Sequence, residues 1–270
     1  MPTTAVQLRI RYLYHYQRYG AEVATRLEAM LRTNRLYMSS PAQFNDPWDC
    51  RPWFDLDALA TQAGREEHIA WFMRLPEARA ADAEELRNNP DLLRFMVDDC
   101  SRSMGQRIND EYRVYCLTPC DQNMLMWSHY SGDHKGICLQ FKVRSEPFVG
   151  ACQIAYQERL PLSTLPEQQD DAMTKALLTK SDVWSYEREF RVVAKNPLFA
   201  SPGVPTATDG FVTTSENALE RIIIGCACSD DDAEAIVETV RRHRPRVSVR
   251  RARRRTDVYG LAFTDLHTGH

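Results

Sequence analysis

Features typical of membrane, exported and repeat proteins are missing from this sequence of 270 residues. No run of apolar residues reaches the roughly 18 that a membrane-spanning helix needs, so we expect no membrane association. The first residues lack the basic region and apolar stretch of a secretory signal, which predicts a cytoplasmic protein. No internal repeat or low-complexity segment occurs, and this argues against a repeat architecture.

Metal-site spacing is also missing, although the chain has eight cysteines. Neither Cys116-x3-Cys120 nor Cys226-x-Cys228 has the two-residue spacing that is common in zinc sites. His129 and His134 are five positions apart, so they do not share one face of a helix. We therefore predict no metal site and expect most of the cysteines to be buried thiols in a reducing compartment.

Positive and negative charge nearly balance overall but are distributed unevenly. The net charge is −3, yet residues 241–255 contain nine arginines and follow an acidic segment at 230–236. Such a basic stretch is one way to contact phosphate groups. No aromatic residue interleaves with these arginines for base stacking, so we favour solvated or substrate-phosphate-facing arginines over a nucleic-acid groove.

The spacing of apolar residues predicts a single α+β domain over residues 1–270. Residues 55–110 show helical periodicity that interrupts the strand pattern, which indicates an inserted helical region. Outside it we expect strands at 8–16, 35–39, 113–117, 136–141 and 219–225 and helices at 21–33, 124–130, 171–180 and 231–242. A chain of this length can bury a sizeable core without a second domain.

The segment 184–193 combines core-forming residues with closely spaced charge. As a strand it places its aromatic side chains on one face and Glu187, Glu189 and Arg191 on the other. Strands are depleted in glutamate, so this charged face is a candidate polar site. The alternative is an exposed edge strand with a cross-strand ion pair, because ion pairs can imitate functional sites.

Two other segments carry candidate ligand contacts. Asn45 and Asp46 precede Pro47 and either fix a local turn or aim their side chains at a ligand. His129 and Tyr130 lie before Gly132 and Gly136, whose small size permits close approach of the backbone. For His129, a partly buried histidine and a ligand contact remain alternative interpretations.

Three sequence blocks resemble the bacterial family known as domain of unknown function number 2971. These blocks are Phe44-Asn-Asp-Pro-Trp-Asp49, Met126-Trp-Ser-His-Tyr130 with His134-Lys-Gly136, and Lys180-x3-Trp184-x-Tyr-Glu-x-Glu-Phe-Arg191. Leu13-Tyr-His-Tyr16 resembles the opening block of that family, which more often has lysine in place of His15. The resemblance spans residues 12–260, but the family name implies no activity.

The order of the elements is also similar to that of the ADP-ribosyltransferase superfamily, whose split mixed or antiparallel sheets bind NAD as a substrate. A strand with His15 is followed by a helix, a strand with Tyr37 and Ser39, and a late strand with the Glu-x-Glu pair. This resemblance implies that Glu189 and Glu187 are catalytic. It also implies an NAD site made from His15, Tyr16, Tyr37, Ser39, Asn45, Asp46, His129, Tyr130, Arg188 and Arg191.

The functional roles within that implied site follow from the same superfamily. His15 and Tyr16 are expected at the adenosine side, Tyr130 or Tyr37 against nicotinamide, and Arg188 or Arg191 near a phosphate. A carboxylate beside the ribose stabilises the positive charge that develops as nicotinamide leaves.

Three functions therefore compete at this point. The first is ADP-ribosyl transfer from NAD to an unknown macromolecular acceptor, a protein or a nucleic acid, in a toxin or phage-defence effector. The second is nucleic-acid processing, favoured by the arginine-rich segment. The third is a noncatalytic ligand-sensing or antitoxin-like module in which the polar motifs only order loops.

Overall fold

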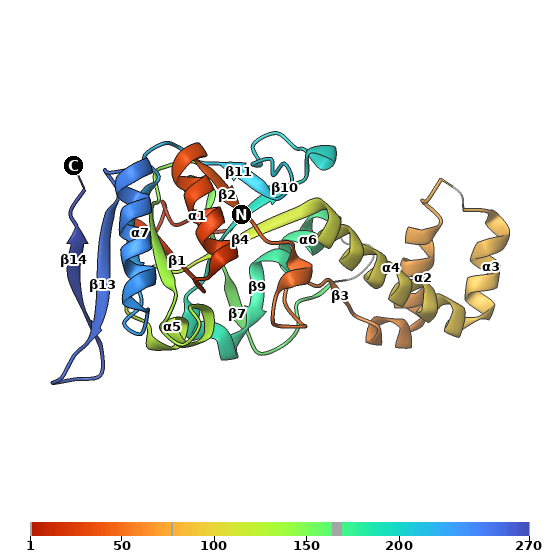
Figure 1. The fold of residues 1–270 in the computed structure, drawn as a ribbon. Coiled ribbons are helices and arrows are strands. Elements are labelled where there is room, and N and C mark those ends of the chain that lie inside the picture. The colour runs from red at the N-terminus through yellow and green to blue at the C-terminus, as the bar shows by residue number, and fades with distance from the viewer. Residues whose placement is uncertain (1, 77, 164–168, 270) are drawn as a thin grey trace. The chain divides into compact units, whose positions relative to one another are not determined.

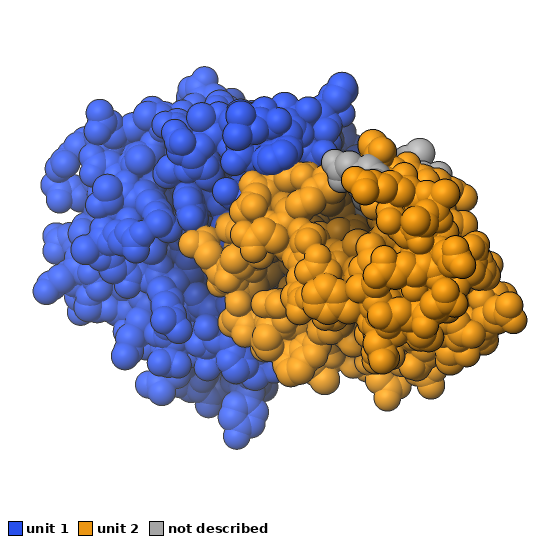
Figure 2. All heavy atoms as spheres, turned by 90° about the vertical axis from the view of Figure 1, so that its right-hand side faces the viewer, with its two compact units in different colours: residues 1–39, 113–154, 185–270 blue, residues 40–112, 155–184 orange. Residues whose placement is uncertain are grey.

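The computed structural model describes residues 2–76, 78–163 and 169–269 of a mixed α and β protein (Figure 1). The chain divides into two compact units, which are coloured separately in Figure 2. Unit 1 comprises residues 1–39, 113–154 and 185–270, and unit 2 comprises residues 40–112 and 155–184. Among the helices of the described residues, none has the length and apolarity needed to cross a membrane.

A five-stranded mixed sheet forms the centre of unit 1, in the order β1-β5-β12-β13-β14. Its strands are β1 (Tyr12–Gln17), β5 (Ile137–Lys142), β12 (Leu219–Ile224), β13 (Ser248–Arg254) and β14 (Leu261–His267). β12 and β13 are parallel and the other neighbours are antiparallel. The parallel pair is connected by helix α7 (Asp230–His243), as a crossover between parallel strands requires.

Helices α7 and α1 (Ala21–Thr33) contact each other and bury their apolar faces in the main core of unit 1. The stripe Ala233, Ile236, Val237 and Val240 follows helical spacing and is buried. Ser229 caps the start of α7, and its hydroxyl accepts a hydrogen bond from the backbone N–H of Asp232. Aspartates in its first turn and arginines in its last turn complement the helix dipole, and this accounts for the acidic segment that precedes the arginines in the sequence.

The remaining elements of unit 1 form smaller groups. A second sheet has the order β4-β10-β6, and β2 pairs with β11. The bounds are β2 (Arg35–Tyr37), β4 (Tyr112–Leu117), α5 (Met124–Tyr130), β6 (Cys152–Gln153), β10 (Phe190–Lys195) and β11 (Phe211–Thr213), with short 3-10 helices η3 (Phe148–Gly150) and η5 (Pro197–Phe199).

The described residues of unit 2 form four α-helices and two short pairs of parallel strands. Its elements are η1 (Pro41–Gln43), β3 (Trp53–Phe54), η2 (Asp57–Ala60), α2 (Gln62–Phe72), α3 (Ala80–Asn88), α4 (Pro90–Glu111), β7 (Ala155–Gln157), β8 (Leu162–Ser163), α6 (Gln169–Leu178) and β9 (Thr179–Ser181). β3 pairs with β8, and β7 pairs with β9. The inserted region predicted at 55–110 holds η2, α2, α3 and nearly all of α4, and the compact unit also takes in residues 155–184.

The strand predicted over 184–193 is wrong in its first half. Asp182–Glu187 forms the 3-10 helix η4, and β10 begins only at Phe190. Between them, Arg188 has a left-handed backbone (φ 50°), and its N–H donates to the carbonyl of Ser185. Glu187 and Glu189 therefore do not lie on one face of a strand, because local turn formation overrides the aromatic strand propensity of the segment.

The strand predicted over 8–16 also begins later than expected. β1 starts at Tyr12, because the preceding residues form turns in which the N–H of Leu8 donates to Thr4 and that of Arg9 to Val6. The helix predicted at 171–180 ends at Leu178, and Lys180 belongs to β9. The helix predicted over 124–130 is confirmed as α5.

Candidate functional site

Glu189 and Arg191 form a buried ion pair in unit 1. Their side chains are 3% and 0% exposed. Arg191 donates from Nε to Oε1 at 2.7 Å and from Nη2 to Oε2 at 3.1 Å, so the guanidinium engages both carboxylate oxygens. This two-point contact fixes the orientation of the carboxylate as well as its position. The exposed edge strand considered above is excluded for these two residues.

Glu187 is also buried and is held by a residue of α5. The hydroxyl of Tyr130 donates to Glu187 Oε1 at 2.5 Å. The neighbouring carbonyl of Tyr186 accepts from the side-chain amide of Asn123 at 2.8 Å, and the same Asn123 caps the start of α5. Two hydrogen bonds therefore connect the end of η4 to α5, and they bring the second and third sequence blocks together.

His129 and Arg188 lie beside these pairs but are exposed. The ring of His129 lies 6.3 Å from that of Tyr186 and 6.4 Å from that of Tyr130, measured between centroids. His129 therefore belongs to a small aromatic group next to Glu187. This arrangement favours the interpretation of His129 as an accessible side chain over that of a partly buried histidine.

His15 is held in a neutral state inside unit 1. Burial lowers the pKa of this imidazole from 6.5 to about 4, and a backbone contact at Cys116 opposes the shift only partly. Nδ1–H donates to the Cys116 carbonyl at 2.8 Å, and the ring stacks on Tyr115 with centroids 4.1 Å apart. At neutral pH His15 therefore offers no positive charge to a phosphate.

Other residues of the predicted NAD set in unit 1 have structural contacts. The hydroxyl of Tyr16 donates to the Cys120 carbonyl at 2.8 Å, and burial raises the pKa of this phenol. Tyr37 packs edge-on against Phe211, under the guanidinium of Arg26 at 4.2 Å. Ser39 exchanges two backbone hydrogen bonds with Val114.

A pocket of about 570 Å³ lies within unit 2. It is lined by Asn45, Asp46, Pro47, Trp48, Asp49, Arg51, Trp53, Gln157, Glu158, Arg159, Leu160, Pro161, Ala176, Thr179, Lys180, Ser181, Val183 and Trp184. Asn45 and Asp46 are thus brought together with residues of the third block, 180–184. Sequence reasoning placed Trp48, Asp49, Lys180 and Trp184 in family blocks but did not select them as site residues.

The polar lining of this pocket is ordered by specific contacts. Lys180 Nζ lies 3.8 Å from Asp49 Oδ2, with both side chains buried, and 5.0 Å from the centre of the Trp184 ring. Asp46 Oδ1 accepts a hydrogen bond from the backbone N–H of Trp48 at 2.9 Å. This contact fixes a local turn, which is one of the two interpretations of Asp46 given by the sequence. The pocket therefore combines a buried cation with a carboxylate partner and aromatic walls.

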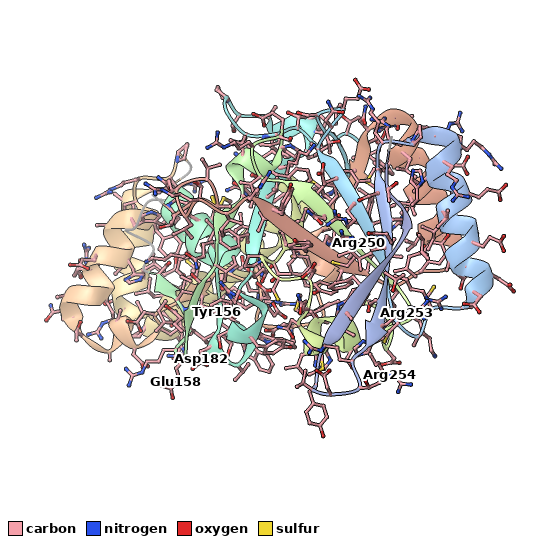
Figure 3. The ribbon with its side chains drawn as sticks, turned by 90° about the vertical axis from the view of Figure 1, so that its left-hand side faces the viewer. Tyr156, Glu158, Asp182, Arg250, Arg253 and Arg254 are labelled. Atoms are coloured by element: carbon pink, nitrogen blue, oxygen red, sulfur yellow. The ribbon has the colours of Figure 1, made fainter. Side chains whose placement is uncertain are left out.

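Two arginines of β13, Arg250 and Arg251, form ion pairs with carboxylates of unit 1. Arg250 pairs with Asp265, Arg251 with Asp230, and Arg253 donates to the hydroxyl of Thr264. Figure 3 labels Arg250, Arg253 and Arg254 on this strand, and also Tyr156, Glu158 and Asp182 of unit 2. Internal pairing lowers the charge that the segment can present to a polyanion, so nucleic-acid processing gains no support here.

Comparison with protein-family models, with curated proteins and with solved structures finds no match to this chain. Within the described residues, no group of three or more His, Cys, Asp or Glu side chains is arranged to hold a metal ion.

Proposed function

We propose that the chain is an ADP-ribosyltransferase that uses NAD as its substrate. The observation that carries the proposal is the fixed state of the Glu-x-Glu carboxylates, with Glu189 held by Arg191 and Glu187 by Tyr130. A carboxylate oriented before the reaction stabilises developing positive charge without reorganisation, which is the main electrostatic requirement of this chemistry. The resemblance in element order supplies the reaction class.

In the proposed reaction, the bond between the ribose carbon and the nicotinamide nitrogen breaks, and its electron pair leaves with nicotinamide. The Glu189 carboxylate stabilises the positive charge on the ribose carbon. A nucleophile of the macromolecular acceptor then forms the new bond to that carbon. Glu187 accepts the proton of the nucleophile, while the Tyr130 hydroxyl keeps its carboxylate in place.

The proposed NAD contacts differ from the full predicted set. Tyr16 is assigned a positioning role, because its hydroxyl is already bonded to the Cys120 carbonyl. His15 remains a contact for the adenosine ribose through Nε2, because Nδ1–H is used by Cys116. Of the two arginines in the predicted set, Arg188 is exposed and Arg191 is buried, so Arg188 is assigned to a phosphate of NAD. We propose that the protein acts in the cytoplasm as a toxin or phage-defence effector, and that it belongs to the family known as domain of unknown function number 2971.

The test uses Glu187→Gln, because a glutamine carbonyl can still accept the Tyr130 hydrogen bond. Nicotinamide release from NAD is measured together with circular dichroism. We expect the variant to keep its fold and to lose about 10²- to 10⁴-fold in rate, as is typical for removal of a general base. Glu234→Gln, which changes an exposed carboxylate of α7 in unit 1, is the matched control and should keep the wild-type rate.

A second candidate function is noncatalytic binding of a small molecule. The pocket in unit 2 favours it, since its volume of about 570 Å³ lies within the range of ~300–1,000 Å³ that is usual for small-molecule sites. This function predicts ligand binding with no turnover of NAD.

A further inference from the structure

We propose that the pocket of unit 2 binds a planar aromatic small molecule that carries an acidic group, of the chemical class of a nucleoside monophosphate. The ring lies against Trp48 and Trp184, and the acidic group faces the cations of the pocket. The inference does not rest on ADP-ribosyl transfer, because the lining residues belong to unit 2 whereas Glu187 and Glu189 belong to unit 1.

The aromatic part of the ligand is indicated by the apolar walls. Trp48 is 59% exposed although it lines a pocket, and Val183 is 70% exposed beside Trp184. Leu160 adds a third exposed apolar side chain at the same pocket. Adjoining apolar surface that folding leaves exposed marks binding sites. Tryptophan rings favour a flat partner, because stacking on an aromatic side chain tolerates any base.

The acidic part of the ligand is indicated by the cations of the lining. Lys180 lies buried beside Trp184, and Arg51 and Arg159 are exposed members of the same lining. A cationic ligand would meet Lys180 at the aromatic face where cations are normally bound, and two like charges repel there. An anionic group instead avoids this repulsion and gains from the exposed Arg51 and Arg159.

The acidic side chains of the pocket do not reverse this preference. The Asp49 carboxylate pairs with Lys180, and Asp46 accepts the backbone N–H of Trp48. Glu158 is exposed, and it follows Gln157, whose side-chain amide donates to the Arg159 carbonyl at 2.6 Å. Asp49 is thus paired with a cation and Asp46 is held by a backbone N–H, and Glu158 is the exposed carboxylate among the lining residues.

The decisive experiment is calorimetric titration of the full chain with 5′-AMP, with adenosine and ribose 5-phosphate as probes for the ring alone and the phosphate alone. We expect AMP to bind with a dissociation constant below about 1 mM, and each partial probe to bind at least tenfold more weakly. Adenosine binding as tight as that of AMP would overturn the acidic part of the proposal. Failure of AMP, GMP and UMP to bind below about 1 mM would overturn it as a whole.

Variants assign the binding to this pocket. Trp48→Ala removes an exposed ring, so it should leave folding intact and weaken AMP binding at least tenfold. Trp184→Leu should also weaken AMP binding at least tenfold. Trp71→Phe changes a tryptophan of α2 outside the pocket and is the matched control. Wild-type affinity in Trp48→Ala contradicts the inference. Glu187→Gln should keep AMP binding, because Glu187 is not part of this pocket. A failure of the proposed transferase chemistry can therefore be distinguished from a failure of AMP binding.

Discussion

Arg191 contacts both carboxylate oxygens of Glu189 inside unit 1, and neither side chain is more than 3% exposed. Each residue carries a charge whose burial is offset in part by the other. The pair therefore has a function in folding as well as in orienting the carboxylate assigned to catalysis. This coupling decides which substitutions can test the site.

Arg191→Met should destabilise the protein by roughly 3–5 kcal/mol, because it removes the positive charge that Arg191 places against the buried Glu189 carboxylate. The double variant Glu189→Leu with Arg191→Met should recover much of that loss, because it removes both charges. Urea unfolding measures these free energies. Arg242→Met is the control, because the exposed pair with Glu238 should contribute less than about 1 kcal/mol. Equal effects of the two arginine substitutions contradict the role of burial.

Two buried tyrosines of unit 1 provide a matched test of hydrogen bonding. The buried hydroxyl of Tyr115 has no hydrogen-bond partner among the described residues, whereas the hydroxyl of Tyr16 donates to the Cys120 carbonyl. Tyr115→Phe should leave the free energy of unfolding unchanged or raise it by about 1 kcal/mol, because it removes an unpaired buried group. Tyr16→Phe should lower it by about 1 kcal/mol. Thermal unfolding of both variants measures the two changes. A larger loss of stability in Tyr115→Phe than in Tyr16→Phe contradicts the prediction.

Stability should fall with acidification because of His15. Burial lowers the pKa of this side chain from 6.5 to about 4, so between these values the unfolded chain binds a proton that the folded protein does not. The contribution is fully present above pH 6.5 and is lost as the pH falls towards 4, with a total on the order of 3 kcal/mol. Urea unfolding of the wild type and His15→Gln across this range measures it. The variant should show the shallower pH dependence, and identical slopes contradict the assignment.

The regular elements could be predicted because their signals are local. The apolar stripe of α7 and the α5 segment both follow helical spacing, and the structure places helices there. The segment 184–189 could not be predicted in this way. Its alternating aromatic residues indicate a strand, whereas η4 is held by hydrogen bonds from Asn123 and Tyr130, residues more than 50 positions away. Propensity gives no information on such long-range contacts.

The candidate sites show the same division. Glu187 and Glu189 stand out in the sequence because strands rarely contain two glutamates, and Arg191 was expected on the same face. The contact of Glu187 with Tyr130 follows only from the fold. The pocket of unit 2 was not predicted. Its lining combines the segments 45–49 and 180–184, and the sequence alone does not show that segments so far apart meet.

The central claim is that the fixed carboxylates act on NAD, and calorimetric titration of NAD combined with nicotinamide release tests it most directly. The wild type should bind NAD with micromolar or tighter affinity and release nicotinamide. Glu187→Gln should bind NAD but lose most of the nicotinamide release, and Glu234→Gln is the control that should stay active. A folded wild type that neither binds nor consumes NAD at high protein concentration contradicts the account.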